Sequence, residues 1–226
     1  MQNHEDDADD EGTIWFSESG AEEAILSQLT ALEEDGMLVR SVAESSRPDG
    51  SSVSASRFLD LGTGNGHLLF ALQEEDEDGN CWQGEMVGVD YSETSIQLAT
   101  RIAKQKDAEL TSFERWDLLC DPPGHWLKDG FAVVLDKGTF DAISLMPTSD
   151  YEQHPCEVYR NKVVPLIKPG CFLCVTSCNW TKAELMEWLA PGSGALSLYS
   201  EAKYPTFTFG GQTGQSIVTV VFRKAS

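Results

Sequence analysis

Residues 57–66 read Arg-Phe-Leu-Asp-Leu-Gly-Thr-Gly-Asn-Gly, an apolar run that reaches a carboxylate and continues into three glycines at alternate positions. Residues 67–72 follow as an apolar segment that we interpret as a helix. Strand, glycine turn and helix in this order form a pocket for a nucleotide-like ligand, because glycines let the ligand approach the backbone and the helix N-terminus offers unpaired N–H groups. Glycines that serve only the geometry of the turn are the alternative. We expect cofactor contacts from six residues of this turn: Asp60, Gly62, Thr63, Gly64, Asn65 and Gly66.

Three further acids lie at or next to the ends of predicted strands. They are Asp90, Asp117 and Asp136, and they close the runs 86–90, 112–117 and 131–136. In an open parallel sheet the binding crevice lies at the carboxyl ends of the strands, so these acids should gather there with Asp60. Capping of the following helix is the alternative role for any one of them.

The order of the predicted elements indicates a single α/β domain. Four strand-then-helix units and a closing pair of strands make an open, mostly parallel sheet of seven strands with helices on both faces. The last two strands should form an antiparallel hairpin, because no segment of helix length separates them. The expected strands are 57–60, 86–90, 112–117, 131–136, 170–176, 196–204 and 216–222, and the expected helices are 21–32, 67–72, 92–103, 152–167 and 181–189.

The composition is strongly acidic. The 226 residues include 37 acidic and 16 basic side chains, a formal net charge of −21. Such a polyanion repels nucleic-acid phosphates and favours a basic protein partner. Residues 1–12 are acidic and poor in apolar side chains, so we expect a disordered tail there and a folded domain over 13–226.

No run approaches the ~18 apolar residues of a membrane span, and the acidic start is unlike a secretion signal. We expect a monomer in the cytoplasm, with the nucleus as a second location.

The predicted helix 21–32 has apolar residues along one face, and Trp15 and Phe16 stand just before it. Two interpretations stay open. The helix packs on a sheet edge, or Trp15 and Phe16 cover the ligand pocket as a lid. Trp15 is therefore included among the expected cofactor contacts.

Six cysteines are present, and Cys171, Cys174 and Cys178 are close enough in sequence to suggest a metal cluster. They lie on or just past a predicted strand, where residues three apart point to opposite faces. We therefore expect buried, reduced thiols and no metal site.

The glycine spacing separates two classes of cofactor. Dinucleotide sites have the pattern G-x-G-x-x-G, whereas the third glycine here, Gly66, comes one residue early. A G-x-G-x-G turn after an apolar strand that ends in Asp resembles that of the class I S-adenosylmethionine-dependent methyltransferases, and the resemblance extends over residues 57–223. It implies a Rossmann-like domain with S-adenosyl-L-methionine as the methyl donor. Asp90 can accept from both ribose hydroxyls, and Asp117 from the adenine amine.

Longer motifs narrow the resemblance. They are residues 14–16, 61–66, 89–92, 136–145, 176–181 and 207–211. Together they are similar to the translation elongation factor 1-alpha lysine methyltransferases of the methyltransferase-like-10 type. The most specific are Asp-Lys-Gly-Thr-Phe-Asp at 136–141 and Ser-Cys-Asn-Trp-Thr at 177–181. The resemblance implies methyl transfer to a lysine ε-amine of that factor; the short N-terminus and the acidic insertion at 74–78 are departures. The additional cofactor contacts expected are Trp15, Tyr91, Trp116, Leu118 and Asp136.

A lysine acceptor must lose a proton before it attacks the methyl group. At an unperturbed pKa of ~10.4, deprotonation at pH 7 costs about 4.6 kcal/mol. An aromatic, poorly hydrated channel lowers that pKa. We expect aromatic walls for such a channel, with ordinary core packing as the alternative, and we expect Asp136 or the Asn179 amide to orient the amine. The expected catalytic residues are Asp136, Asn179 and Trp180, and the expected substrate-binding residues are Lys137, Phe140, Trp180 and Phe209.

Other functions fit the sequence less well. A nucleic-acid amine methyltransferase would carry Asn/Asp-Pro-Pro-aromatic at the end of the fourth strand, where Asp-Lys-Gly-Thr stands at 136–139. The Asp-Pro-Pro-Gly at 121–124 precedes that strand. The glycine spacing argues against a dehydrogenase. The acids present at every strand end argue against a binding module that has lost its catalytic activity. A small-molecule methyltransferase on the same fold stays open, because substrate loops are poorly encoded in sequence.

Overall fold

The computed structural model describes residues 19–41, 54–76, 78–147, 153–192, 194–205 and 216–226, together with the backbone of 207–209 and 212–214. The expected acidic tail, 1–12, and Trp15 lie outside these residues, so the statements about them stay predictions. Within these ranges, no helix combines the length and the apolar character that crossing a bilayer requires.

Seven strands form one sheet in the order β3-β2-β1-β4-β5-β9-β6. The first five of that order are parallel neighbours, and β9 runs antiparallel to both β5 and β6. This confirms the mostly parallel seven-stranded sheet and its antiparallel closing pair. The strands are β1 (Phe58–Leu61), β2 (Met86–Asp90), β3 (Thr111–Arg115), β4 (Phe131–Lys137), β5 (Ile167–Ser177), β6 (Leu196–Glu201) and β9 (Val218–Lys224). A separate two-stranded sheet, β7 (Phe207–Phe209) with β8 (Gln212–Gly214), lies in the connection from β6 to β9.

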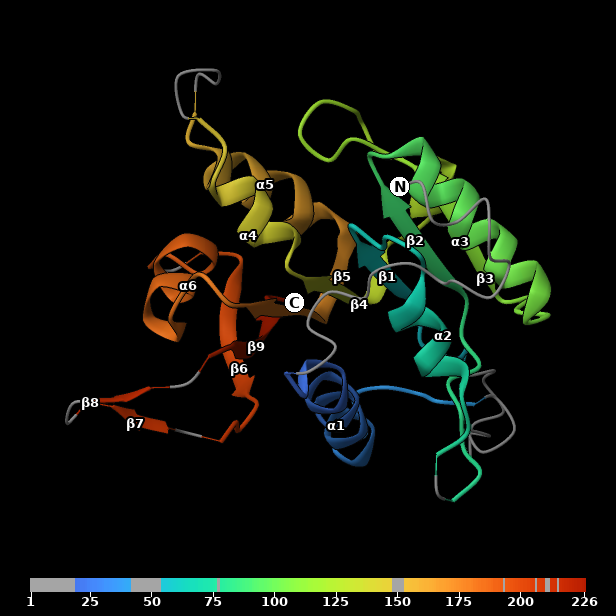
Figure 1. Ribbon diagram of the computed structural model, residues 1–226, viewed down its shortest axis with the longest axis horizontal. Helices are drawn as coiled ribbons and strands as arrows, with labels where there is room; N and C mark the ends of the chain where they lie inside the picture. The colour runs from blue at the N-terminus through green and yellow to red at the C-terminus, as the bar shows by residue number, and fades with distance from the viewer. Residues whose placement is uncertain are drawn as a thin grey trace.

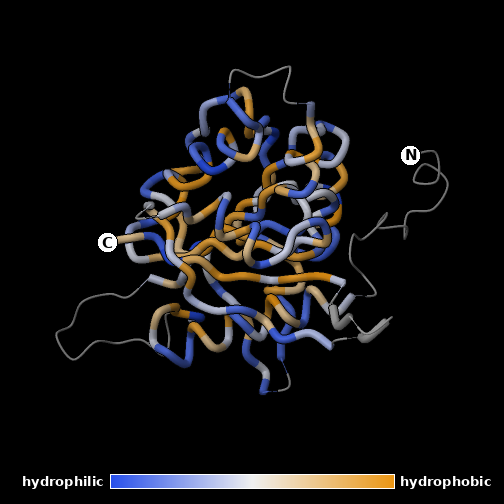
Figure 2. Tube along the Cα trace, turned by 90° about the vertical axis from the view of Figure 1, so that its left-hand side faces the viewer, coloured by the Kyte–Doolittle hydropathy of each residue, from blue (hydrophilic) through white to orange (hydrophobic). Residues whose placement is uncertain are grey.

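Helices cover both faces of the sheet, with α1, α2 and α3 on one face and α4, α5 and α6 on the other (Figure 1). The helices are α1 (Ala21–Glu34), α2 (His67–Gln73), α3 (Glu93–Gln105), α4 (Thr139–Ser144), α5 (Pro155–Val163) and α6 (Lys182–Leu189), with short 3₁₀ turns η1 (His125–Leu127) and η3 (Val164–Leu166). The apolar segments run through the centre and the hydrophilic ones lie outside (Figure 2). This arrangement confirms the three-layer α/β architecture.

The strand register brings the predicted acids to one edge. Leu61 of β1 pairs with Val89, the residue before Asp90, and on its other side with Asp136 of β4. The carboxyl ends of β1, β2 and β4 therefore lie at one level. The site is built at this edge.

The boundary between α5 and β5 differs from the prediction. The helix expected over 152–167 ends at Val163, and β5 begins at Ile167 rather than at residue 170. Pro165 explains the early end, because it lacks an N–H and its ring clashes with the carbonyl four residues back. The strand also takes in Lys168-Pro169-Gly170, which coincides with a shift of register against β4.

A short helix, α4, was not predicted. It spans only six residues, Thr139–Ser144, too few to show a helical period in the sequence. Asp136 determines where it begins, because its carboxylate accepts from the backbone N–H of Thr139 at 2.9 Å and of Phe140 at 3.0 Å. The Asp136 side chain therefore caps a helix, as the alternative interpretation held.

Two predicted strands end early. β3 stops at Arg115 rather than residue 117, and β6 stops at Glu201 rather than residue 204. After β3 the Asp117 carboxylate accepts from the N–H groups of Leu119 and Cys120 and turns the chain away from the sheet. Asp117 therefore lies just past its strand.

Helix α1 packs over the middle of one sheet face, so the first of the two interpretations, packing on a sheet edge, was wrong. Its residues Ile25, Leu29 and Leu32 are buried with Val133 of β4 and Val221 of β9. α1 therefore closes the core on this side of the sheet.

All six cysteines are free thiols. Cys174 is buried as expected and Cys171 is half-buried, but Cys178 is exposed because it follows the last residue of β5. In the part of the chain that the structure describes, no three His, Cys, Asp or Glu side chains are grouped to hold a metal ion.

Candidate active site

The glycine turn between β1 and α2 presents an open backbone. Gly62 and Gly64 both have positive φ, 65° and 57°, which side-chain-bearing residues rarely adopt. A Cβ on Gly62 would lie 2.0 Å from Thr139 Oγ1, whereas a Cβ on Gly64 would meet nothing within 4 Å. Gly62 is therefore required by packing, and Gly64 faces open space that a ligand can approach.

A Gly62→Ala variant is expected to lose about 2–5 kcal/mol of unfolding free energy, from left-handed strain plus the clash with Thr139. Gly36→Ala is the matched control, because Gly36 has φ +71° with nothing within 4 Å of its Cβ position. That control should lose only about 1–2 kcal/mol. Urea unfolding measures both; equal losses would show that the contact with Thr139 is unimportant.

Asp90 holds this turn in place. Its carboxylate accepts from Gly64 N at 3.0 Å and from Ser92 N at 2.9 Å, and the residue is 8% exposed. Each carboxylate oxygen can accept more than one hydrogen bond, so capacity remains for a diol at this edge. The neighbouring Tyr91 is exposed.

A group of charges lies where β1 and β4 end. Burial raises the pKa of Asp60 from 3.8 to about 6, and the Lys137 charge opposes that rise. Burial likewise lowers the pKa of Lys137, opposed by Asp60 and by Glu22 of α1. Glu22 also lies 3.1 Å from Nε2 of His67 on α2. Both signs of charge are thus available here, which suits a zwitterionic amino-acid group.

The Thr63 hydroxyl is a buried polar group within the glycine turn. It lies near enough to Asp60 to lower the pKa of that carboxyl, yet no partner among the described residues is aligned for a hydrogen bond with it. An unsatisfied buried hydroxyl together with an open Gly64 cradle fits a turn that receives a polar ligand.

Asp136 lies beneath the site surface. It is 1% exposed, and besides capping α4 it accepts from the Tyr159 hydroxyl at 2.6 Å. Burial raises the pKa of Asp136 to about 7; the Tyr159 and Phe140 hydrogen bonds oppose that rise, and the charge of Asp141 adds to it. Tyr159 carried no sequence signal beyond its place in a predicted helix.

The Asp136 carboxyl makes stability depend on pH. Its folded pKa lies above the ordinary 3.8, so the stability it contributes is fully present below 3.8 and is lost as pH rises towards about 7. Asp136→Asn removes this titration. We expect the unfolding free energy of the variant to gain about 2–3 kcal/mol relative to wild type between pH 5 and pH 8. A constant difference in urea unfolding across this range would contradict the shift.

Trp116 and Leu118, two expected cofactor contacts that follow β3, are buried. Trp116 is 4% exposed, its Nε1–H donates to Pro122 O at 3.0 Å, and its ring packs edge-on against Trp126. Leu118 is also buried in this cluster. The structure therefore places the Trp116 indole in the core and leaves Asp117 as the polar group of this segment.

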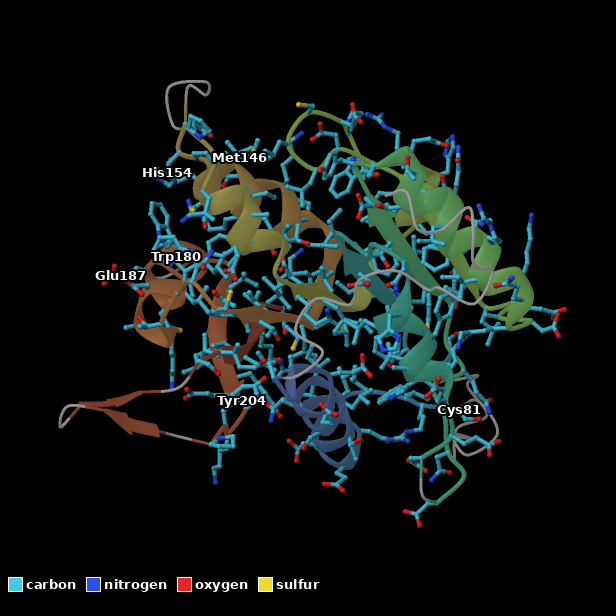
Figure 3. All side chains as sticks on the ribbon, viewed as in Figure 1. Cys81, Met146, His154, Trp180, Glu187 and Tyr204 are labelled. Atoms are coloured by element: carbon cyan, nitrogen blue, oxygen red, sulfur yellow. The ribbon has the colours of Figure 1, made fainter. Side chains whose placement is uncertain are left out.

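Trp180 follows the end of β5 and is half-buried beside α4. Its Nε1–H donates to Ser144 Oγ at 2.9 Å, and its ring centroid lies 6.3 Å from that of Phe140 and 6.3 Å from that of Trp188. Figure 3 shows Trp180 on the same side of the molecule as Met146, His154 and Glu187. The half-buried Trp180 ring thus lies beside α4, just past the end of β5.

One of the predicted channel walls belongs to the core, and another cannot be placed. Phe140 is fully buried and packs against Tyr159 at 4.9 Å, so it is core, as the alternative interpretation held. The Phe209 side chain lies outside the described residues, although its backbone forms part of β7.

Asp141 and Ser177 were not predicted as site residues. They lie inside the two most specific motifs and form a hydrogen bond with each other.

A cavity of about 330 Å³ lies elsewhere, between α5, η3 and the end of α6. Its lining ends at Ala195, just before the start of β6, and includes no residue at the carboxyl ends of the parallel strands. The acids and the glycine turn do not line it, so we locate the chemistry at the strand ends.

Comparisons with known proteins identify the family of this chain. Residues 52–225 match the family model described as a methyltransferase domain. Protein-lysine N-methyltransferase EFM4 of Saccharomyces cerevisiae is 34% identical over 99% of this chain and 88% of the yeast protein. EEF1A lysine methyltransferase 2 of Homo sapiens is 33% identical over 95% of this chain and 77% of the human protein.

A solved structure supports the fold. The TehB-like SAM-dependent methyltransferase from Corynebacterium glutamicum superposes with a TM-score of 0.54 at 15% identity, covering 91% of this chain and 98% of that chain. The chain therefore belongs to the methyltransferase-domain family, as an S-adenosylmethionine-dependent enzyme related to the protein-lysine N-methyltransferases.

Proposed function

We propose that the protein transfers methyl groups to a lysine ε-amine of translation elongation factor 1-alpha. The observation that carries this is the meeting of two specific motifs: residues 136–141 and 177–181 come together at the adjacent carboxyl ends of β4 and β5. The relatives at 33–34% identity carry names that state lysine methylation. The alternative is a methyltransferase of the same fold that acts on a small molecule, and the experiment below distinguishes the two.

The glycine turn and the strand-end acids would hold the donor. Asp90 would accept from the ribose hydroxyls, because it already fixes Gly64 at this edge. Asp60 and Lys137 would face the amino-acid part of the donor. Its ammonium and carboxylate groups need partners of opposite charge. Asp117 would accept a hydrogen bond from the amine of the adenine base, because its carboxylate can accept more hydrogen bonds than those of its own turn. When bound, the donor supplies a methyl group on a positively charged sulfur, ready for displacement.

The acceptor amine would approach beside Trp180 and Asn179. The Trp180 ring would exclude water from the amine, which favours its neutral, nucleophilic form. Asp136 lies below, where its buried negative charge would stabilise the positive charge that develops on the amine nitrogen during transfer. Alignment of amine and methyl group would supply most of the rate enhancement.

A basic partner fits the electrostatics. The net charge is −21, and Glu187 is exposed on α6 on the same side as Trp180 (Figure 3). The opposite charge of a basic partner steers its encounter with the protein, whereas like charge repels nucleic acids. We further propose that the protein acts as a monomer, away from membranes, in the cytoplasm or the nucleus. Light scattering of the purified protein and imaging of a tagged copy test these statements.

The test is incubation of the purified protein with methyl-labelled donor and purified elongation factor 1-alpha, followed by mass spectrometry of the digested factor. We expect label on one or a few lysines. Factor whose lysines have been blocked by reductive methylation is the matched control and should take up none. A labelled small molecule from a deproteinised cell extract, with an unlabelled factor, would favour the small-molecule alternative.

A further inference from the structure

Asp141 of α4 and Ser177 at the end of β5 are buried polar residues that bond to each other. They are 3% and 0% exposed, and the Ser177 hydroxyl donates to Asp141 Oδ1 at 2.5 Å. The other oxygen, Oδ2, accepts from Cys178 N at 2.8 Å. A carboxylate is expensive to bury unless its oxygens are hydrogen-bonded, and the bonds from Ser177 and Cys178 supply that compensation.

Ser177 passes this anchoring on to the next two residues. Its Oγ accepts from Asn179 N at 3.1 Å and from Trp180 N at 3.0 Å. With its own proton donated to Asp141, the hydroxyl uses its full hydrogen-bonding capacity. Three successive backbone N–H groups, of residues 178–180, are thus held by two side chains.

The indole of Trp180 is tied to the same helix. Trp180 Nε1–H donates to Ser144 Oγ at 2.9 Å, and the Ser144 hydroxyl donates to the carbonyl of Asp141 at 2.7 Å. Both the backbone and the ring of Trp180 are therefore connected to Asp141, one through its side chain and the other through its carbonyl.

We infer that Asp141, acting through Ser177, is the positioning residue that sets Asn179 and Trp180 for the acceptor lysine. This inference rests on the proposed function. The residues it anchors are those proposed to meet the amine, while the donor contacts at Asp60, Gly64 and Asp90 lie on other elements. Loss of Asp141 or Ser177 should therefore impair transfer and leave donor binding unchanged.

The test variants are Asp141→Asn and Ser177→Ala. Calorimetry should give a donor Kd within about threefold of wild type, whereas kcat for the protein acceptor should fall by about 100-fold, as misplacement of a reacting group by an ångström does. Ser144→Ala, which frees only the ring, should have a smaller effect. Ile102→Ala is the stability control: it opens a cavity between α2 and α3, far from this network, and should leave kcat unchanged at a temperature where it is folded. Unchanged kcat in Asp141→Asn and Ser177→Ala would overturn the inference.

A double-mutant cycle separates positioning from a direct role. If Asp141 acts through Trp180, Asp141→Asn combined with Trp180→Ala should lose no more activity than the more damaging single change. Multiplied losses would show that Asp141 acts independently and would overturn the inference.

Amide hydrogen exchange at residues 178–180 gives a readout without any acceptor. It should be faster in Ser177→Ala than in wild type, and unchanged exchange would overturn the anchoring. Faster exchange together with a wild-type protein that does not label the elongation factor would overturn the proposed substrate alone.

Discussion

Asp90→Ala is expected to abolish binding of S-adenosylmethionine that calorimetry can detect. The substitution removes the proposed acceptor for the ribose hydroxyls and also the carboxylate that accepts from Gly64 N. Hydrogen bonds to a charged group contribute about 1.5–3 kcal/mol each, so loss of two corresponds to a weakening of roughly 10²–10⁴-fold. Because transfer needs bound donor, methylation should be lost as well.

Asp117→Ala is the matched control for that experiment, since Asp117 also follows a strand and also caps a turn. It would remove one expected contact, to the base, and should weaken donor binding by about tenfold. Circular dichroism establishes that both variants are folded. Wild-type affinity in Asp90→Ala would refute the ribose assignment.

Asp136→Asn is expected to reduce kcat by about 10²–10³-fold, the usual effect of removing one group that stabilises transition-state charge. The amide has nearly the shape of the carboxylate, and its oxygen can still accept from the N–H groups that begin α4. Donor binding should therefore stay within a few-fold of wild type. Unchanged turnover would leave Asp136 with only its capping role.

Tyr159→Phe isolates the hydrogen bond from the charge. The Tyr159 hydroxyl lowers the pKa of Asp136, so its removal should raise that pKa above about 7. Less of the carboxyl is then ionised at neutral pH, and the rise of kcat with pH should move to higher pH. A pH profile identical to that of wild type would show that ionisation of Asp136 does not limit transfer.

Much of the fold could be predicted because its signals are local. The apolar runs that form β1, β2 and β4 are short and nearly uninterrupted, which is typical of buried parallel strands, and each has an acid at or next to its last residue. Boundaries were less accurate where local signals conflict. α5 ends at Pro165 while the apolar pattern continues into β5, and α4 is too short for a periodicity to appear.

The candidate site was predictable in part. Asp60 and Asp90 lie at the glycine turn as expected, because the carboxyl ends of neighbouring parallel strands meet at one edge of the sheet. Exposure could not be predicted. Phe140 and Trp116 turned out to be buried, while Cys178 is exposed, because which face of a residue is covered depends on helices far away in sequence.

The sequence by itself determined the order of strands and helices along the chain, the glycine turn and the placement of acids at strand ends, because each of these depends on residues close together in the chain. Only the tertiary structure decided that Tyr159 bonds to Asp136 and that Ser177 bonds to Asp141, 23 and 36 residues apart. Those pairs exist because β4 and β5 are neighbours in the sheet and α4 and α5 pack on the same face. Such contacts follow from the order of the strands across the sheet and from the packing of the helices, which local sequence patterns do not specify.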